Sequence, residues 1–410
     1  MIASLPSKLD MAKSSIGTGN AGSNYTHLPM NSECLDAFNI TEAEADYYKY
    51  SKSDSYLLTL FLPLLLVFGI VGNGLFIYVA VKIPHMRTIT NRYLVSLSVA
   101  DILFLGSAIG SKIWKYARSP VLGDETSLGQ FGCVGVYFLS DVGYFASLIF
   151  VTLVSADRFV AVCRPQERHS FIKGKSMEII GLCWLVSGFL AATLTPGNAH
   201  QQVFCMKWPQ TDTYKGWPNV IRYCSPLQHL EWISSFANGL QTIPFLITFV
   251  LNVVLYVAII RGLNQCIRRM SQHGVAKSKD AGMRNQIAKM LVVNGVVFFC
   301  LLAPFEIYSL FGMIAIFRTE NHLAKYLIQN EDARMYILLV SQLLSYINSV
   351  VNPIIYSVMC RRYRQAFREA LLPASCLERS LKKGSGPESC RTGAIPLEPT
   401  GPTETNDTNV

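Results

Sequence analysis

The sequence predicts an all-α membrane protein: a seven-transmembrane helix bundle with a short amphipathic helix after the seventh span. Of the 410 residues, 50% are hydrophobic and only 15% are charged, and the mean hydropathy is +0.29, which is too apolar for an ordinary soluble chain. Seven apolar runs are each long enough to cross a bilayer. The net charge of +9 resides largely in short connections between these runs, which favours contact with anionic lipid and argues against a nucleic-acid partner.

The predicted spans divide the chain into four parts. Residues 1–55 form an N-terminal tail, 56–360 the bundle, 361–372 the amphipathic helix and 373–410 a disordered tail rich in Gly, Pro, Ser and Thr. The seven runs lie at roughly 56–81, 91–114, 130–163, 177–196, 230–260, 286–317 and 335–359.

The charge distribution predicts which side of the membrane each end occupies. The connections after the first, third and fifth runs are the most basic, and by the positive-inside rule they lie in the cytosol. The N-terminal tail lacks the apolar core of a signal peptide and is expected to be flexible, with glycosylation sequons at Asn24 and Asn39. We therefore expect a multi-pass plasma-membrane protein whose N-terminus is extracellular and whose C-terminus is cytosolic.

The third run, Phe131–Pro165, carries a distinct chemical group at each end. It begins beside Cys133, holds Asp141 near its start, and ends with the acid-base pair of Asp157 and Arg158. At about 1.5 Å per residue, the helix from Cys133 to Arg158 is about 37 Å long, slightly more than the hydrocarbon core of a bilayer. The rest of the chain is organised around this helix.

Polar residues within apolar spans cost free energy and usually carry function. Six of them are predicted to lie near the inner half of their spans: Asn73, Asp101, Ser147, Asn348, Ser349 and Asn352. An ordinary polar contact between helices would explain any one alone, but six residues that include a carboxylate favour one hydrated cluster around Asp101. We expect this cluster to bind Na⁺ or a proton, with Asp101, Ser147, Asn348 and Asn352 as its ligands, and we expect no other cofactor.

Short motifs occur in every span in a defined order. They are Gly72-Asn73, Leu97-Ser98-Val99-Ala100-Asp101, Cys133 with Asp157-Arg158-Phe159, Trp184, Pro244, Phe298 with Pro304, and Asn352-Pro353-Ile354-Ile355-Tyr356. Over residues 55–372 this set resembles the rhodopsin-like (class A) G protein-coupled receptors. The segment His85–Asn91 and the seventh span further resemble neuropeptide receptors of the thyrotropin-releasing hormone, neuromedin U, ghrelin and neurotensin group.

The resemblance implies that ligand binding is passed to a heterotrimeric G protein by outward movement of the sixth helix. Arg158 would pair with Asp157 at rest and turn toward the G protein on activation; an arginine that snorkels to lipid phosphates is the alternative. The residues expected to take part in activation are Asp157, Arg158, Phe298, Pro304, Asn352, Pro353 and Tyr356. Three of the spans contain prolines that leave a backbone carbonyl unpaired and form hinges.

The resemblance also implies a disulfide between Cys133 and the second extracellular loop, Gly197–Gln228. Cys224 is preferred to Cys205 as its partner, because 20 residues separate Cys224 from Pro244 and suit a strand returning directly to the fifth span. Cys205 would pair with Cys34 or stay free, and both options remain open. The loop forms a wide lid suited to a peptide.

The ligand would bind in the outer half of the bundle. The predicted lining residues are Tyr137, Asp141, Tyr144, Glu306, Tyr308, Gln342, Tyr346 and Lys112, with Trp114 beside them. Two carboxylates favour a ligand with a cationic group, because an unpaired buried acid would otherwise be protonated. The alternative, that Lys112 neutralises one of them, stays open. We expect the ligand to be an extracellular peptide.

The segment after the seventh span carries three further signals. Tyr363, Phe367 and Leu371 are spaced as the apolar stripe of a membrane-surface helix, and Cys376 beyond it would be palmitoylated or remain a free thiol. Phosphates on Thr403, Thr405 and Thr408 would attract an arrestin. The terminal Thr-x-Val pattern fits a PDZ-domain protein, and an inert tail is the alternative to both partners.

Three departures from the family pattern limit these expectations. Leu302 replaces the usual tryptophan, so an indole cannot transmit the signal there. Asn252 replaces a common tyrosine, which puts its contact with Tyr356 in doubt. Arg284 stands where many members have an acid, so a glutamate latch to Arg158 is not expected.

Other classes fit less well. Amine receptors have an aspartate where this chain has Ser140, and opsins need a lysine in the seventh span, which has none between Arg334 and Arg361. A transporter would show internal repeats, and a membrane enzyme would show metal ligands or paired aspartates; neither pattern is found. We therefore expect that this protein is not an enzyme. An atypical class A receptor, for a small molecule or without G protein coupling, is the alternative.

Overall fold

The computed structural model describes residues 38–164, 175–198, 200–225, 231–272, 279–317 and 331–371. Within them, seven helices are long and apolar enough to cross a membrane. These spans are Lys52–Lys82, Ile89–Arg118, Thr126–Cys163, Ser176–Gly197, Gly239–Gln265, Asn285–Leu310 and Tyr336–Met359. Each overlaps one predicted run, and the predicted helical membrane bundle is confirmed.

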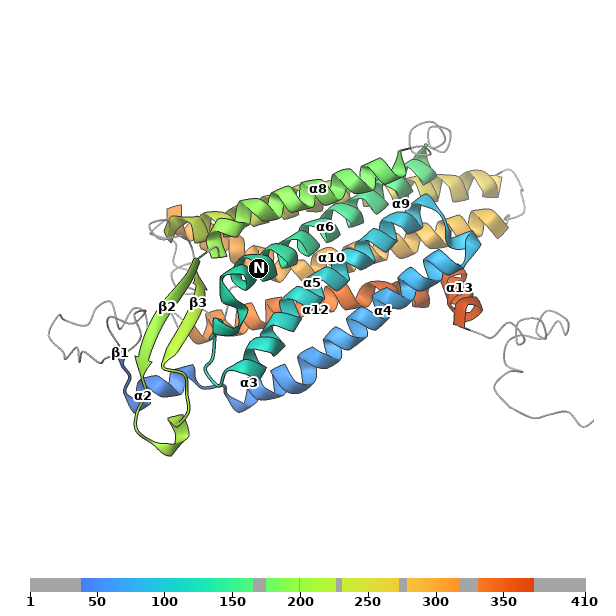
Figure 1. Ribbon diagram of the computed structural model, residues 1–410. Helices are drawn as coiled ribbons and strands as arrows, with labels where there is room; N and C mark the ends of the chain where they lie inside the picture. Colours follow the sequence, from blue (N-terminus) through green and yellow to red (C-terminus); the bar gives the residue numbers. More distant parts are fainter. Residues whose placement is uncertain are drawn as a thin grey trace, which may run out of the picture.

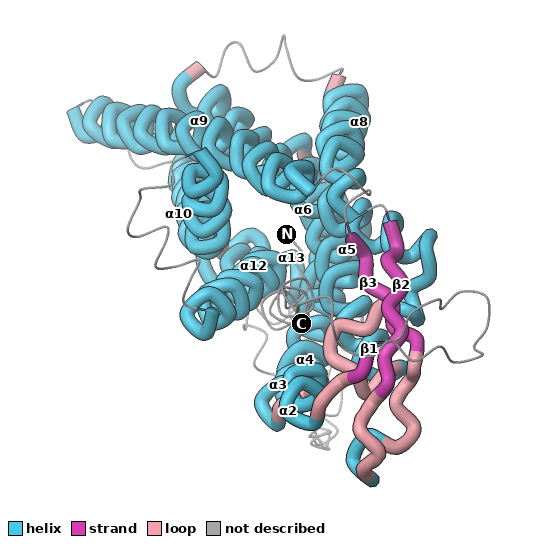
Figure 2. The backbone as a smooth tube through the Cα atoms, turned by 90° about the vertical axis from the view of Figure 1, so that its left-hand side faces the viewer, coloured by secondary structure: helices cyan, strands magenta, loops and turns pink. Residues whose placement is uncertain are grey.

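Six of these helices form a closed ring, and one lies outside it (Figure 1 and Figure 2). The bounds are α4 Leu62–Lys82, α5 Ile89–Arg118, α6 Gly129–Cys163, α8 Ser176–Leu194, α9 Glu231–Gln272, α10 Lys279–Phe317 and α12 Glu331–Met359. In the ring α4, α5, α6, α9, α10 and α12 contact one another in that order, and α12 returns to α4. Because α6 contacts α5, α8, α9 and α10, it is the central helix. α8 packs against α6 from outside, and its Leu182, Leu185 and Phe189 are exposed, as a lipid-facing helix requires.

A three-stranded sheet stands at one end of the bundle (Figure 1). β2 (His200–Lys207) and β3 (Val220–Ser225) are an antiparallel hairpin in which His200 pairs with Ser225 and Cys205 with Val220. β1 (Phe38–Asn39) adds to β2 in parallel. The second loop between α8 and α9 is therefore a folded lid.

The described residues before α4 are more ordered than the sequence predicts. The described part of the expected flexible tail forms β1, α2 (Glu42–Ala45) and α3 (Lys52–Tyr56), and a π-helical turn at Leu57–Phe61 joins α3 to α4. Capping boxes start both short helices, at Thr41 with Glu44 and at Ser51 with Asp54. Apolar side chains of this segment pack on the hairpin, and their burial provides the reason for the order.

Pro353 in α12 shows how the bundle satisfies a broken helical ladder. A proline at this position cannot donate to the carbonyl of Ser349, four residues earlier. Asn73 of α4 donates its Nδ2 to that carbonyl oxygen at 2.9 Å and to Gly69 O at 3.0 Å. The asparagine of the first span therefore joins α4 to the hinge of α12.

The amphipathic helix α13 (Arg361–Leu371) follows α12 at the end of the bundle opposite the sheet (Figure 1). The hydroxyl of Tyr363 donates to Asn91 Oδ1 at 2.6 Å, and Lys82 Nζ donates to the carbonyl of Ala370 at 2.9 Å. Of the predicted membrane-facing stripe, Tyr363 is instead buried in the bundle and Phe367 packs against its core, whereas Leu371 is exposed. These contacts hold α13 against the ends of α4 and α5 that lie far from the sheet.

Candidate functional site

Two acidic residues lie in the half of the bundle nearest the sheet. Asp141 of α6 and Glu306 of α10 are both buried, and Glu306 is only 1% exposed. The hydroxyl of Tyr144 donates a hydrogen bond to Glu306 Oε1. Glu306 Oε2 is buried and has no hydrogen-bond partner in the described part of the chain. Neither carboxylate forms an ion pair with a described residue, so each can accept a cation.

A lysine lies in the same half of the bundle. Lys112 Nζ of α5 donates to Gln342 Oε1 of α12 at 2.7 Å and lies 6.0 Å from the centre of the Tyr346 ring. Its partner is thus an amide, and not one of the two carboxylates that the sequence left open. Trp114 is 46% exposed and has the Arg118 guanidinium over its ring, so it lies at the outer surface of α5.

Glu125, in the loop before α6, joins three elements under the lid. Its Oε1 accepts from Lys115 Nζ and from the Tyr137 hydroxyl, each at 2.7 Å, and its Oε2 accepts from the backbone N–H of Cys224 at 2.6 Å. Glu125 is 1% exposed, so these contacts are shielded from solvent. The hydroxyl of Tyr137, predicted to line the ligand site, therefore points to the lid.

The predicted disulfide is present beside this carboxylate. Cys133 and Cys224 are bonded, with Cα atoms 5.5 Å apart. Cys205 is also disulfide-bonded, and the partner considered for it, Cys34, is not among the described residues. The covalent bond and Glu125 together fix β3 to the start of α6.

Five of the six polar residues of the spans are joined by hydrogen bonds, Asn73, Asp101, Ser147, Ser349 and Asn352, and what they bind stays a prediction. Asp101 is fully buried, and its Oδ1 accepts from Ser147 at 3.1 Å while its Oδ2 accepts from Asn352 at 2.8 Å. Asn348 Oδ1 is buried and has no described partner. These oxygen atoms are the donor type that a hard cation such as Na⁺ prefers.

At the end of α6 far from the sheet, Arg158 contacts Asp157 and Thr90. Its Nη2 lies 2.5 Å from Asp157 Oδ2 and also contacts the hydroxyl of Thr90. Thr90 in turn donates to Asp157 Oδ2 at 2.6 Å. The pairing of Asp157 with Arg158 is as expected, whereas Thr90 of α5 is an additional partner. The side chain of Arg284 lies outside the described set.

Tyr256 of α9 fills a notch in α10 on the same side of the bundle. Its hydroxyl and that of Ser155 on α6 lie 3.1 Å apart. A Cβ at Gly295 would lie 1.6 Å from the Tyr256 hydroxyl, so the glycine makes room for the ring. Asn252, one turn earlier, donates to Thr152 of α6 at 2.7 Å. Asn252, at the position that usually holds a tyrosine, is thus bonded to α6, and the phenol of Tyr256 lies one turn further along α9.

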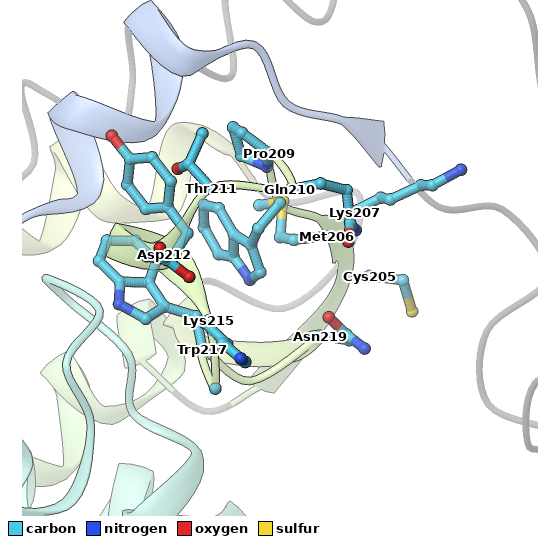
Figure 3. Close-up of a pocket in the computed structure, with 13 residues that line it drawn as sticks. Cys205, Met206, Lys207, Pro209, Gln210, Thr211, Asp212, Lys215, Trp217 and Asn219 are labelled. Atoms are coloured by element: carbon cyan, nitrogen blue, oxygen red, sulfur yellow. The ribbon is translucent and has the colours of Figure 1, made fainter.

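The lid has a small aromatic core and a cavity of about 640 Å³ at the hairpin tip (Figure 3). Met206, Trp208, Tyr214 and Trp217 are among its lining residues. Trp208 contacts Tyr48 of the N-terminal segment edge-to-face, with ring centres 5.5 Å apart. Burial, with the Glu44 charge, raises the pKa of Tyr48 to about 12. The lining residues of this cavity all lie between Cys205 and Asn219 and include neither Asp141 nor Glu306.

Sequence reasoning missed Glu125, Thr90, Tyr256 and Gly295. Glu125 had one sequence signal, an acid in a short loop ten residues after Lys115, but the contact with Cys224 depends on the fold of the second loop. Thr90 and Gly295 have no sequence signal, because a threonine at the start of a helix and a glycine within a span are both common. Tyr308 is partly buried on α10, and no role follows from its position.

Comparison with known families agrees with this architecture. The profile "7 transmembrane receptor (rhodopsin family)" matches residues 72–356, which is more than half of the chain. The chain belongs to the rhodopsin family of receptors. It is therefore a multi-pass membrane receptor, and the family is not one of enzymes.

Several receptors resemble this one over most of their length. G-protein coupled receptor 54 of Oreochromis niloticus is 27% identical over 330 residues, which cover 80% of this receptor and 81% of that one. Neuromedin-U receptor 2 of Homo sapiens is 28% identical over 317 residues, covering 76% and 70%. Thyrotropin-releasing hormone receptor of Mus musculus is 24% identical over 343 residues, covering 77% and 78%. The resemblance to neuropeptide receptors inferred from the motifs is thus confirmed at the level of distant relatives.

Proposed function

We propose that this receptor binds an extracellular peptide with a cationic group and activates a heterotrimeric G protein by outward movement of α10. The observation that carries the ligand class is the pair of buried acids, Asp141 and Glu306, without a cationic partner among described residues. The relatives named for neuromedin U and thyrotropin-releasing hormone support a peptide.

The cationic group binds between α6 and α10. Tyr144, on α6, donates a hydrogen bond to Glu306 Oε1 on α10. Glu306 Oε2 is then available to the ligand. Asp141 lies three residues before Tyr144, so the two side chains lie on the same face of α6. An arginine or lysine of the peptide, or its terminal amine, would satisfy both acids, and burial makes such pairing favourable.

The signal then passes along α6 toward the cytosol. The polar cluster at Asp101 joins α5, α6 and α12, and rearranges when the ligand pulls α6 and α10 together. α10 moves outward at Pro304, and Phe298, Pro353 and Tyr356 repack. Arg158 then leaves Asp157 and Thr90 to contact the G protein.

We further propose a plasma-membrane receptor with its lid outside. The sheet end and the basic connections are consistent with the predicted orientation, and Asn39 is exposed on β1 and accessible to a glycan. The sequon at Asn24, the palmitoylation site at Cys376 and the tail sites for an arrestin or a PDZ-domain protein lie outside the described residues. They remain proposals from the sequence.

The test is a screen of short peptides on the purified receptor in lipid nanodiscs, read out as nucleotide exchange on each G protein family. Agonists should carry a cationic group, and Asp141→Asn and Glu306→Gln should each lower their potency by roughly tenfold to a hundredfold, as expected for a lost charge-assisted contact. Glu178→Gln, at an exposed cytosolic acid, is the matched control.

Two results would count against the proposal. Peptide that binds without exchange on any G protein would instead indicate an atypical receptor. Agonist potency unaffected by either substitution would place the cationic group elsewhere.

A further inference from the structure

Lys112 introduces a positive charge into the site that holds the two acids. Its Nζ has the Gln342 side-chain oxygen at 2.7 Å and the Tyr346 ring at 6.0 Å, and both of those side chains are buried. Neither neighbour carries a negative charge. Lys112 itself is partly buried, and an ammonium removed from water is stable only when its charge and its donors are satisfied.

The nearby acid is already used by another lysine. Lys115, almost one turn after Lys112, forms an ion pair with Glu125 at 2.7 Å. The same carboxylate also accepts from Tyr137 and from the N–H of Cys224. Both oxygens of Glu125 are therefore engaged by other groups, and no described carboxylate forms an ion pair with Lys112.

The positive and negative groups belong to different pairs of helices. Lys112 and its neighbours Gln342 and Tyr346 lie on α5 and α12, whereas Glu306 and Tyr144 lie on α10 and α6. In the ring, α5 and α12 flank α4, while α6 and α10 flank α9 (Figure 2). A ligand that reaches both groups therefore lies across the bundle.

We propose that Lys112 is an anion subsite and that the ligand is a dipolar peptide. Its carboxylate, from an acidic side chain or the C-terminus, binds Lys112 between α5 and α12, while its cationic group binds between α6 and α10. Gln342 orients the ammonium and leaves two of its three N–H donors for the carboxylate. This inference rests on the proposed function, and it adds the second charge and the orientation of the ligand.

The test uses the peptide agonists from the screen, each made in three forms. One form is the free acid, one is amidated at the C-terminus, and one has its acidic side chains replaced by amides. Loss of the carboxylate that binds Lys112 should reduce potency at the unmodified receptor by roughly tenfold to a hundredfold. The form of the peptide that loses potency shows whether that carboxylate is the C-terminus or an acidic side chain. In Lys112→Gln all three forms should be nearly equipotent.

A second variant keeps the test informative if Lys112→Gln does not reach the cell surface. Gln342→Glu gives Lys112 a carboxylate of its own, so it should also abolish the advantage of the anionic form. Lys49→Gln, at an exposed lysine before the first span, is the matched control and should retain the advantage.

The outcomes separate this inference from the proposed function. Agonists that are equipotent in all three forms at the unmodified receptor would overturn the anion subsite and leave the cationic peptide in place. An advantage of the anionic form that persists in Lys112→Gln or in Gln342→Glu would overturn it as well. A library without any agonist would contradict the peptide function and this inference together.

Discussion

Glu125 Oε2 accepts a hydrogen bond of 2.6 Å from the backbone N–H of Cys224, the residue whose sulfur is bonded to Cys133. The second loop is therefore anchored twice at one residue, covalently to α6 and through a carboxylate to the first loop. Because Glu125 also neutralises Lys115, the lid, α5 and α6 share one buried charge.

Glu125→Gln should loosen the lid. It leaves the Lys115 ammonium buried without a counter-charge, which costs about 3–5 kcal/mol in buried ion pairs. The purified receptor should unfold at a lower temperature, and backbone amides of β2 and β3 should exchange hydrogen faster. Glu42→Gln, at an exposed acid of the N-terminal segment, should change neither quantity. Unchanged exchange in β3 would show that the disulfide alone holds the lid.

Asp101→Asn should remove a response to sodium that needs no ligand to detect. A cation that binds only the folded receptor raises its unfolding temperature, and the increase grows with the logarithm of the cation concentration above the Kd. We expect Na⁺ to stabilise the unmodified receptor relative to choline, and we expect the difference to vanish in Asp101→Asn and shrink in Ser147→Ala. Ser111→Ala, whose hydroxyl bonds only within its own helix, is the control. A sodium response that survives in Asp101→Asn would exclude this cluster as the ion site.

Asp157→Asn should raise basal signalling. The substitution removes the negative charge that pairs with Arg158 and keeps the contact of Arg158 with the Thr90 hydroxyl. Loss of about 1.4 kcal/mol from the resting state would raise basal nucleotide exchange roughly tenfold. The assay uses purified receptor and G protein without ligand. Basal exchange equal to that of the unmodified receptor would indicate that this pair does not restrain activation.

Gly295→Ala should displace Tyr256 from its notch. The added methyl would lie 1.6 Å from the hydroxyl, and overpacking of this kind costs about 1–3 kcal/mol. If the notch is filled only at rest, basal exchange should rise, and Tyr256→Ala in the same chain should relieve the clash. Gly282→Ala is the control, because a Cβ there meets no atom within 4 Å. A fall in thermal stability without any change in exchange would make the notch a packing feature only.

The spans were predictable because their signal is local. An apolar run that crosses the bilayer must be helical, because only a helix satisfies its backbone hydrogen bonds within the segment. The basic connections predict the orientation of each span, so the order of residue types along the chain is sufficient to predict the spans and their orientation. The residues around Asp101 could be predicted for the same reason, since a carboxylate within an apolar run needs polar partners. Cys224 was also correctly chosen as the partner of Cys133.

The tertiary structure alone decided how the charges are paired. Lys112 and Lys115 are equivalent in the sequence, yet one binds an amide of α12 and the other binds Glu125. Tyr256 meets Gly295 only because two helices approach closely at one point. These pairings depend on side chains that are distant in the chain, and a sequence does not contain the distances that determine which charge is neutralised and which is left for a ligand.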